Sequence, residues 1–335
     1  MKDKIFHFFG NIIEQSPIPT PIKLFIAVRL DLILFFLTHF FIGVLRTPAE
    51  YRISEDFMKY IYKNHIDENP QKLDVLKRGL DDDSKSLMDN IVKRQKHMYT
   101  HNVYNSGLLT DDEKADRHIY IYPIKRKYRG FGNYYGIENF YFHCGLRFLS
   151  KNLLRMYKEK DVIDAGASNG DTPAIFSREY VFGNIYAFEP ENNNYEKLLK
   201  NIKRFRLDNV IPVKKGLGDR RRKLRITNEE GQSHISSIGD QEIDIVTIDE
   251  FVEKNNISVG LIKMDIEGFE FYAVQGALRT IKKQHPILLI SIYHSGKDFF
   301  EIKPLLEKIG GYKFIVRKLN PHSLFFDTML IGSPI

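Results

Sequence analysis

The sequence is poor in cysteine and lacks tryptophan: one of its 335 residues is a cysteine, Cys144, and none is a tryptophan. A single cysteine excludes an internal disulfide framework and any metal site built from a cysteine cluster. It fits a reducing compartment, so we expect a cytoplasmic protein. Glycine (22) and proline (13) are too few for a collagen-like chain, and 43% hydrophobic residues are too many for a disordered one. The length allows two or three domains.

The chain also lacks a hydrophobic run of membrane-spanning length. Its most apolar segment, 24–45, is interrupted by Arg29 and Asp31, which leaves about 14 continuous residues where a bilayer core takes about 20. The charged start is soon broken by Glu14 and three prolines, so it does not predict a secretory signal. We expect 24–45 to pack against its own chain or against a second copy in a homodimer. Peripheral contact with the inner membrane face is the alternative.

Positive charge is in mild excess, with 50 Lys and Arg against 43 Asp and Glu. The most basic stretch is 214–225 (KKGLGDRRRKLR), which we interpret as a solvated hairpin; the alternative is a patch that faces an acidic glycan or a membrane. No RNA-binding module or target-base motif accompanies it, so we expect no nucleic acid as a partner.

Three regions follow one another along the chain. Residues 1–115 form a polar, helical N-terminal region, in which the acidic start of LDDDSKSLMDNIVKRQ predicts a capped helix. Residues 116–157 alternate aromatic and basic side chains, which indicates either a connector packed in the core or a substrate cleft that stacks on sugar rings. In residues 158–335 short β-branched runs alternate with helical stretches. This alternation predicts an α/β fold, with a mostly parallel sheet, helices on both faces and an antiparallel strand pair at the end.

The sequence DVIDAGASNGDT contains a short strand, a glycine turn and the start of a helix. Such a turn lets a ligand approach the backbone and the free N–H groups of the helix. The dinucleotide fingerprint fails, because Ser168 and Asp171 stand where its second and third glycines belong. Asp171 would repel a pyrophosphate, but it suits an ammonium or a sulfonium. Further along, Glu189 ends the next strand, where a carboxylate can accept hydrogen bonds from both ribose hydroxyls of an adenosine.

The motif LIKMDIEGFE combines a buried strand with an acidic turn. Strand alternation puts Lys263, Asp265 and Glu267 on one side, at the carboxyl edge of the sheet, where ligands bind in open α/β sheets. The following strand, PILLISIYH, delivers His294 to the same edge. Ionisable groups gathered on one side of a buried strand are costly unless they pair or take part in chemistry. We therefore predict that these four residues form a catalytic edge.

Together these motifs resemble the FkbM family of class I S-adenosylmethionine-dependent methyltransferases. The resemblance covers about residues 158–332 and rests on DVIDAGASNGDT, IYAFEPENNNYEKLLKNI, TIDEF, LIKMDIEGFE, PILLISIYH and YKFIVRK. It implies a Rossmann-like sheet, S-adenosylmethionine as cofactor, and O-methylation of a sugar or polyketide hydroxyl, often in surface-polysaccharide or secondary-metabolite pathways. On this resemblance the cofactor is bound by Asp164, Gly166, Ala167, Ser168, Asn169, Gly170, Asp171, Thr172, Glu189, Pro190, Gly216 and Leu217.

The resemblance does not say which role each residue of the catalytic edge has. His294 has an ordinary pKa near neutrality and could act as the general base, as could Asp265 or Glu267, with Lys263 orienting a carboxylate. Alternatively, Asp265, Glu267 and His294 could hold a divalent cation that acidifies the acceptor hydroxyl. The expected acceptor is a sugar or glycan, possibly anionic or lipid-linked. The remaining alternatives are an RNA methyltransferase, which would need an RNA-binding module, and a catalytically silent scaffold, against which the intact acidic residues argue.

Overall fold

The computed structural model describes residues 48–67, 71–101, 108–114, 118–128, 135–229, 232–235 and 239–335. The apolar segment 24–45, with its alternative packing and membrane roles, lies outside these residues. Among the described helices, none is both long enough and apolar enough to cross a bilayer.

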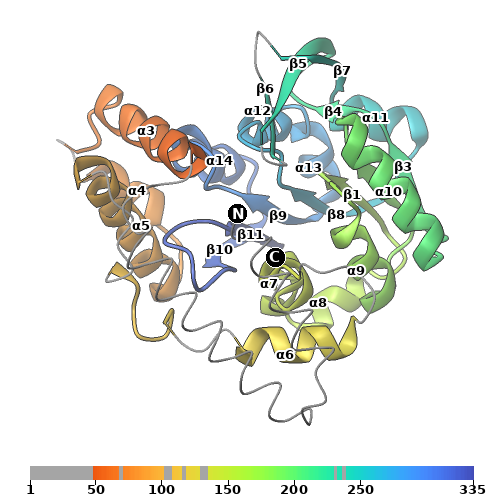
Figure 1. Ribbon diagram of the computed structural model, residues 1–335, viewed down its shortest axis with the longest axis horizontal. Helices are drawn as coiled ribbons and strands as arrows, with labels where there is room; N and C mark the ends of the chain where they lie inside the picture. Colours follow the sequence, from red (N-terminus) through yellow and green to blue (C-terminus); the bar gives the residue numbers. More distant parts are fainter. Residues whose placement is uncertain are drawn as a thin grey trace, which may run out of the picture.

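A large sheet forms the centre of the molecule (Figure 1). Its strands are β1 (Asp161–Ala165), β2 (Ile185–Phe188), β3 (Val210–Val213), β8 (Val259–Met264), β9 (Ile287–Ser291), β10 (Tyr312–Lys318) and β11 (Thr328–Pro334). They follow the order β10-β11-β9-β8-β1-β2-β3, and only β11 runs antiparallel to its neighbours, β9 and β10. The predicted parallel sheet with an antiparallel closing pair is thus confirmed.

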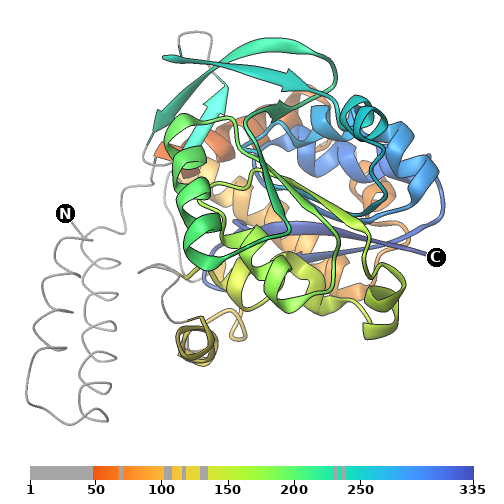
Figure 2. The same ribbon diagram turned by 90° about the vertical axis from the view of Figure 1, so that its right-hand side faces the viewer.

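Helices cover both faces of this sheet (Figure 2). They explain why β8 and β9 are buried at every position and carry almost continuous apolar runs, since both faces of these strands are covered. The helices that alternate with the strands are α9 (Asp171–Glu179), α10 (Asn192–Phe205), α11 (Ile248–Asn255), α12 (Glu270–Gln275), α13 (Leu278–Gln284) and α14 (Gly296–Glu307).

The helix expected after the acidic turn is split into α12 and α13. The spacing of apolar residues from Ala273 to Ile281 predicts one continuous helix, but the chain bends at Gly276. A Cβ on Gly276 would lie 2.0 Å from the Gly218 carbonyl oxygen, so the backbone is pressed against a neighbouring segment there. Asp249 then accepts the backbone N–H groups of Arg279 and Thr280, at 3.1 and 2.8 Å, and so caps the start of α13.

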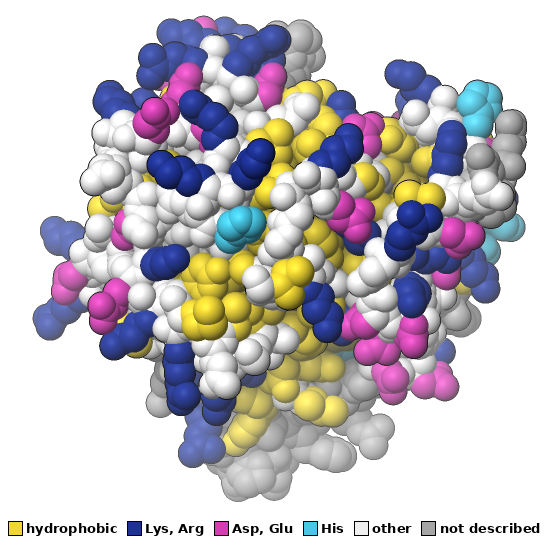
Figure 3. Space-filling view, turned by 180° about the vertical axis from the view of Figure 1, so that it is seen from behind, with side chains coloured by type: hydrophobic (Ala, Val, Ile, Leu, Met, Phe, Trp, Pro, Cys, Tyr) yellow, Lys and Arg dark blue, Asp and Glu magenta, His cyan; other side chains and the backbone are white. Residues whose placement is uncertain are grey.

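A smaller sheet stands at one end of the molecule. It contains β4 (Gly216–Leu217), β5 (Arg222–Glu229), β6 (Gln232–Ile235) and β7 (Gln241–Val246) in the order β4-β7-β5-β6. The basic run 214–225 is therefore not a hairpin of its own, because β4 and β5 both pair with β7 instead of with each other. Lys and Arg side chains gather over this sheet, at the top of Figure 3.

The N-terminal helices cover the β10 edge of the large sheet. They are α3 (Pro48–Lys63), α4 (Gln71–Lys77) and α5 (Asp82–His101). The acidic cluster caps α5 as predicted, since Asp81 accepts the Ser84 N–H at 2.9 Å, although the helix runs beyond the expected end. The Ser84 hydroxyl accepts the N–H of Val316 in β10 at 2.8 Å, and Arg317 forms a 2.6 Å ion pair with Asp81. The helical region is thus joined directly to the sheet.

The aromatic and basic region contains α6 (His118–Lys127), α7 (Ile137–Phe140), the 3₁₀ segment η2 (His143–Phe148) and α8 (Lys151–Met156). Tyr128, Tyr135 and Phe140 are buried, and the rings of both tyrosines lie 5.2 Å from the ring of Phe140. These contacts agree with the core interpretation of this region. Tyr122 is 58% exposed and does not take part in that core.

Candidate active site

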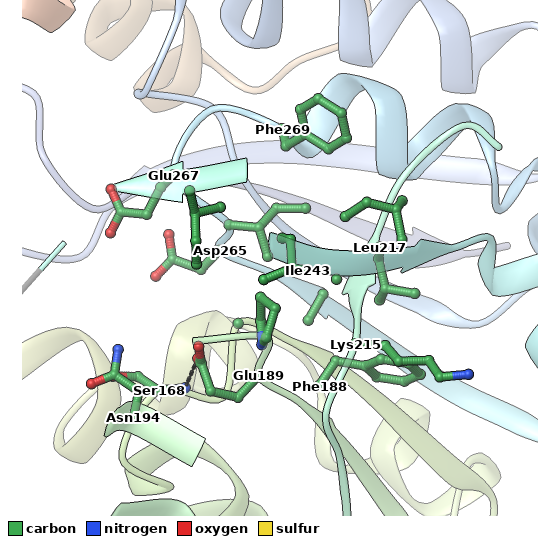
Figure 4. A pocket seen from close by; sticks show the side chains of 17 residues that line it. Ser168, Phe188, Glu189, Asn194, Lys215, Leu217, Ile243, Asp265, Glu267 and Phe269 are labelled. Carbon is green, nitrogen blue, oxygen red and sulfur yellow. Dashed lines mark hydrogen bonds between the residues drawn. The ribbon is translucent and has the colours of Figure 1, made fainter. Parts of the chain in front are cut away.

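A cleft opens at the carboxyl edge of β1, β2 and β8, between the large and the small sheet (Figure 4). The space within it, including the part open to solvent, is about 750 Å³. Its lining includes six of the residues expected to bind the cofactor: Gly166, Ser168, Glu189, Pro190, Gly216 and Leu217. The other predicted cofactor residues do not line it: Asp164, Ala167, Asn169, Gly170, Asp171 and Thr172.

One wall of the cleft is apolar and was not predicted. It contains Ile226, Ile243 and Ile245 of the small sheet, together with Phe269 from the turn after β8. The available signal was the alternation in QEIDIV, where Ile243 and Ile245 fall on one face of a strand, as in a half-buried strand. Leu217, Ile243 and Phe269 lie at the opposite end of the cleft from the carboxylates of Asp265 and Glu267 (Figure 4). The cleft therefore has an apolar end and an acidic end.

The glycine turn after β1 forms part of the floor. Gly166 has φ +80°, and a Cβ there would lie 1.9 Å from the Asp265 carbonyl oxygen, so a larger residue would separate the two loops. Gly170, at φ +94°, precedes α9. Thr172 faces away from the cleft, since its hydroxyl donates to Asn139 at 3.4 Å. Burial raises the pKa of Asp171 to about 6.

Glu189 stands at the end of β2 with its carboxylate beside the glycine turn. One oxygen accepts the Ser168 N–H at 2.8 Å and the other accepts the Glu191 N–H at 2.9 Å (Figure 4 shows the first). A carboxylate oxygen has a second lone pair, so each can still accept a hydroxyl. Burial raises the pKa of Glu189 to about 7. Glu189 is thus held rigidly where the sequence predicts a ribose contact.

Lys263 lies beneath the cleft and not among the acids at its edge. Its ammonium is 3.2 Å from the Asp164 carboxylate and donates to the Gly166 carbonyl oxygen at 2.8 Å. Burial disfavours the charged form, but Asp164 and Asp265 outweigh burial and raise the pKa of Lys263. The carboxylate that Lys263 orients is therefore that of Asp164, and the pair supports the glycine turn from below.

Glu270 organises the acidic turn, and the sequence did not single it out. It is fully buried, and its two oxygens accept the N–H groups of Ile266 and Gly268 at 2.6 and 2.9 Å. It also lies 2.9 Å from Nδ1 of His294. The available signal was a second acid three residues after Glu267, at the start of a helix. This one side chain fixes both the turn and the imidazole.

The structure brings His294 together with Asp265 and Glu267, as the sequence predicts. The reason is not strand alternation, because β8 ends at Met264 and Glu267 lies in the following turn with φ +56°. Nε2 of His294 lies 3.5 Å from Glu267 and 3.7 Å from Asp265. Burial alone would lower the pKa of His294, but the three surrounding carboxylates outweigh it and raise the pKa to about 10. The surrounding carboxylates thus favour the imidazolium form of His294, in which neither nitrogen has a lone pair to accept a proton. The base candidates that remain at this edge are carboxylates.

The raised pKa of His294 gives a direct prediction. The imidazole ¹⁵N signals of His294 should remain those of the imidazolium at pH 8, whereas a histidine of ordinary pKa is neutral there. Because the folded pKa lies above the ordinary 6.5, the stability that this charge contributes is complete below pH 6.5 and is lost as pH rises through about 10. In Glu270→Gln the nitrogen shifts should move to the neutral pattern at lower pH. Neutral nitrogen shifts for wild-type His294 at pH 7 would contradict the assignment.

The same cluster has the spacing of a cation site. Donor atoms of Asp265, Glu270 and His294 lie within 4.8 Å of one another. Each oxygen of Glu270 already accepts a backbone N–H group, and one of them lies 2.9 Å from Nδ1 of His294. An ion-paired histidine accounts for these contacts.

Comparisons with known proteins agree with the architecture. Residues 164–314 match the family described as "Methyltransferase FkbM domain". The crystal structure of methyltransferase FkbM from Methylobacillus flagellatus KT aligns with a TM-score of 0.53 and 21% identity, over 80% of this chain and 60% of that one. This chain thus spans less than two thirds of that relative. A putative methyltransferase from Streptococcus mutans in complex with SAH aligns at 12% identity and a TM-score of 0.37, over 55% of this chain and 94% of that one. No curated protein matches the sequence.

Proposed function

Residues 164–314 of this chain form an FkbM methyltransferase domain, and from this premise we propose that the protein transfers a methyl group from S-adenosylmethionine to a hydroxyl of a sugar or glycan. The observation that carries the proposal is the cleft with two unlike ends. Its apolar end suits an adenine ring, Glu189 suits the ribose, and Asp265 and Glu267 at the acidic end suit a sulfonium.

The apolar end is matched to a flat heteroaromatic ring. Leu217, Ile243 and Phe269 come from three different segments and line the same cleft (Figure 4). Asn194 lies on the same side as Glu189, at the start of α10, and adds a polar group near the ribose position. The Gly166 turn lets the chain approach the rest of the cofactor closely, because no side chain intervenes.

When bound, S-adenosylmethionine supplies an electrophilic methyl group on its sulfonium. The acceptor oxygen forms a bond to this methyl carbon as the carbon–sulfur bond breaks, and the hydroxyl proton must leave. Asp265 lines the cleft, is 35% exposed at its side chain and accepts a weak hydrogen bond from the Tyr293 hydroxyl at 3.5 Å. We assign Asp265 as the group that takes the proton. The His294 imidazolium holds Asp265 and Glu267 in place by charge.

The first test is cofactor binding at Glu189. Calorimetry with S-adenosylhomocysteine should show clear binding to the wild type and a loss of several kcal/mol in Glu189→Ala, since two hydrogen bonds to a charged group contribute about 1.5–3 kcal/mol each. Glu196→Ala is the matched control, because Glu196 is an exposed acid on α10. Equal affinity of Glu189→Ala and wild type would reject the ribose assignment. Absence of binding to the wild type would reject the proposed function.

A further inference from the structure

Two acidic side chains outside the family match lie beside the catalytic edge. Glu138 belongs to α7, which precedes residues 164–314, and Asp327 stands just before β11, which follows them. The Ile292 N–H donates to the Thr328 carbonyl oxygen at 2.9 Å, so the start of β11 lies against the end of β9, next to His294. The two flanking segments thus meet the methyltransferase domain at the same sheet edge.

The segment that carries Glu138 is fixed on one face of the sheet. A Cβ on Gly145 of η2 would lie 2.8 Å from the side chain of Ile331 and 3.6 Å from that of Leu289, so η2 rests directly on β11 and β9. Asn139, next to Glu138, accepts the Thr172 hydroxyl at the start of α9. Glu138 is therefore anchored where α9 and the ends of these strands meet.

The directions in which the carboxyl pKa values shift agree with this placement. Burial, and then the negative charges of Asp327 and Asp265, raise the pKa of Glu138 to about 8. Burial and Asp265 likewise raise the pKa of Asp327 to about 7. Glu138, Asp327 and Asp265 nevertheless remain partly exposed, and Asp265 lines the cleft.

Ser291 provides an independent sign of a ligand on this face. Ser291 is 1% exposed, and its hydroxyl has no hydrogen-bond partner in the described part of the chain. Ser291 pairs with Met329 in β11, and Leu289, two positions earlier on the same face of β9, lies under η2. Met264 of β8 pairs with Ile290 of β9, so the residues that follow them, Asp265 and Ser291, lie beside each other. A buried hydroxyl without a partner is costly unless a polar ligand or water supplies one.

The charge at this edge selects against anions. The cationic side chains His294, Lys263 and Lys318 are already ion-paired: His294 with Glu270, Lys263 beneath the cleft with Asp164, and Lys318, whose charge acts on Asp327, with Glu113. A carboxyl whose pKa is near neutrality both donates and accepts hydrogen bonds, as a sugar hydroxyl requires. A phosphate or a carboxylate would instead meet Glu138, Asp265 and Asp327, which repel it.

We infer that Glu138, Ser291 and Asp327 form, with Asp265, an acceptor subsite that binds an uncharged sugar through its hydroxyl groups. The inference rests on the proposed methyl transfer, and it narrows the acceptor, since the sequence also allowed an anionic glycan. It further assigns acceptor recognition to segments on either side of the matched domain.

Ligand-observed saturation-transfer NMR on the full chain saturated with S-adenosylhomocysteine tests this subsite. The probes are panels of neutral methyl hexosides, methyl hexosaminides, hexuronic acids and hexose phosphates. Neutral hexosides should bind, and hexuronic acids and hexose phosphates should not. Glu138→Ala and Asp327→Ala should weaken neutral-sugar binding by about tenfold each, as expected for a lost hydrogen bond. The control is Glu242→Gln, an exposed acid on β7.

The amide variants separate recognition from mere support of the fold. Glu138→Gln and Asp327→Asn keep a donor and an acceptor, so they should retain neutral-sugar binding, and the double variant should gain measurable hexuronic-acid binding. Wild-type preference for hexuronic acids or hexosaminides, or unchanged binding in both alanine variants, would overturn the inference. Binding of S-adenosylhomocysteine with no binding of any sugar would also overturn it, whereas failure to bind S-adenosylhomocysteine would reject the proposed function instead.

Discussion

Asp265→Asn should lower turnover by about 10²–10⁴ while changing S-adenosylmethionine affinity far less. The substitution keeps the shape of the side chain but removes the charge that accepts the acceptor's proton. His294 is a poor replacement for it, because Glu270 and Glu267 still favour the protonated imidazolium in this variant. The measurement is methyl transfer to a neutral sugar identified by binding, with cofactor affinity measured in parallel by calorimetry.

Glu267→Gln serves as the matched control for Asp265→Asn. Glu267 belongs to the same turn, has a similar side-chain exposure of 31% and lies a similar distance from His294. We expect a smaller loss than in Asp265→Asn, because the Tyr293 hydroxyl points at Asp265. If Glu267→Gln shows the larger loss, the base is Glu267. If both variants turn over at nearly the wild-type rate, the acidic edge is structural and the mechanism is wrong.

Glu270→Ala should have the largest effect on stability, a loss of about 3–5 kcal/mol in the free energy of unfolding. The reason is that Glu270 is fully buried and satisfies two backbone N–H groups as well as the buried His294 imidazolium. Removal of its carboxylate would leave the two N–H groups without a partner, and His294 with only its longer contacts to Glu267 and Asp265. Chemical denaturation monitored at pH 7 measures the loss as a lower midpoint.

Glu270→Gln and Glu270→Ala/His294→Ala complete the stability experiment. Glutamine keeps one acceptor oxygen, so the loss should be smaller than for alanine. The double variant removes the buried charge together with its partner, and it should recover part of the stability lost in Glu270→Ala. A loss below about 1 kcal/mol in Glu270→Ala, no more than an ordinary surface substitution, would show that the turn does not depend on this side chain.

The sequence predicts that Asp265, Glu267 and His294 meet because their geometry is local, whereas its placement of Lys263 among them was wrong. Asp265 and Glu267 directly follow a buried strand, His294 follows the next one, and parallel strands place their carboxyl ends at one edge. Glu189 is predictable for the same reason. In each case one strand and the residue after it carry the information, and the fold class supplies the rest.

The remaining parts depend on contacts between distant segments. The apolar wall requires β5 and β7 to pair into a second sheet, and no local pattern in the sequence predicts this pairing. Glu270 is an ordinary helix-start acid until the backbone N–H groups of the turn are known to point at it. Glu138 and Asp327 belong to opposite ends of the domain, and only the packing of η2 on β11 brings them to one edge.

The contact between Ser84 and β10 bears on whether the methyltransferase domain can stand alone without the helical region. β10 is an edge strand, and Ser84 exchanges hydrogen bonds with both the N–H and the carbonyl of Val316, at 2.8 and 3.2 Å. Without α5, these groups would face solvent in an open row, which is the template on which another chain adds a strand. A shortened protein that began at β1 would therefore self-associate through β10. We therefore expect the helical region to protect the β10 edge of the large sheet from pairing with another chain.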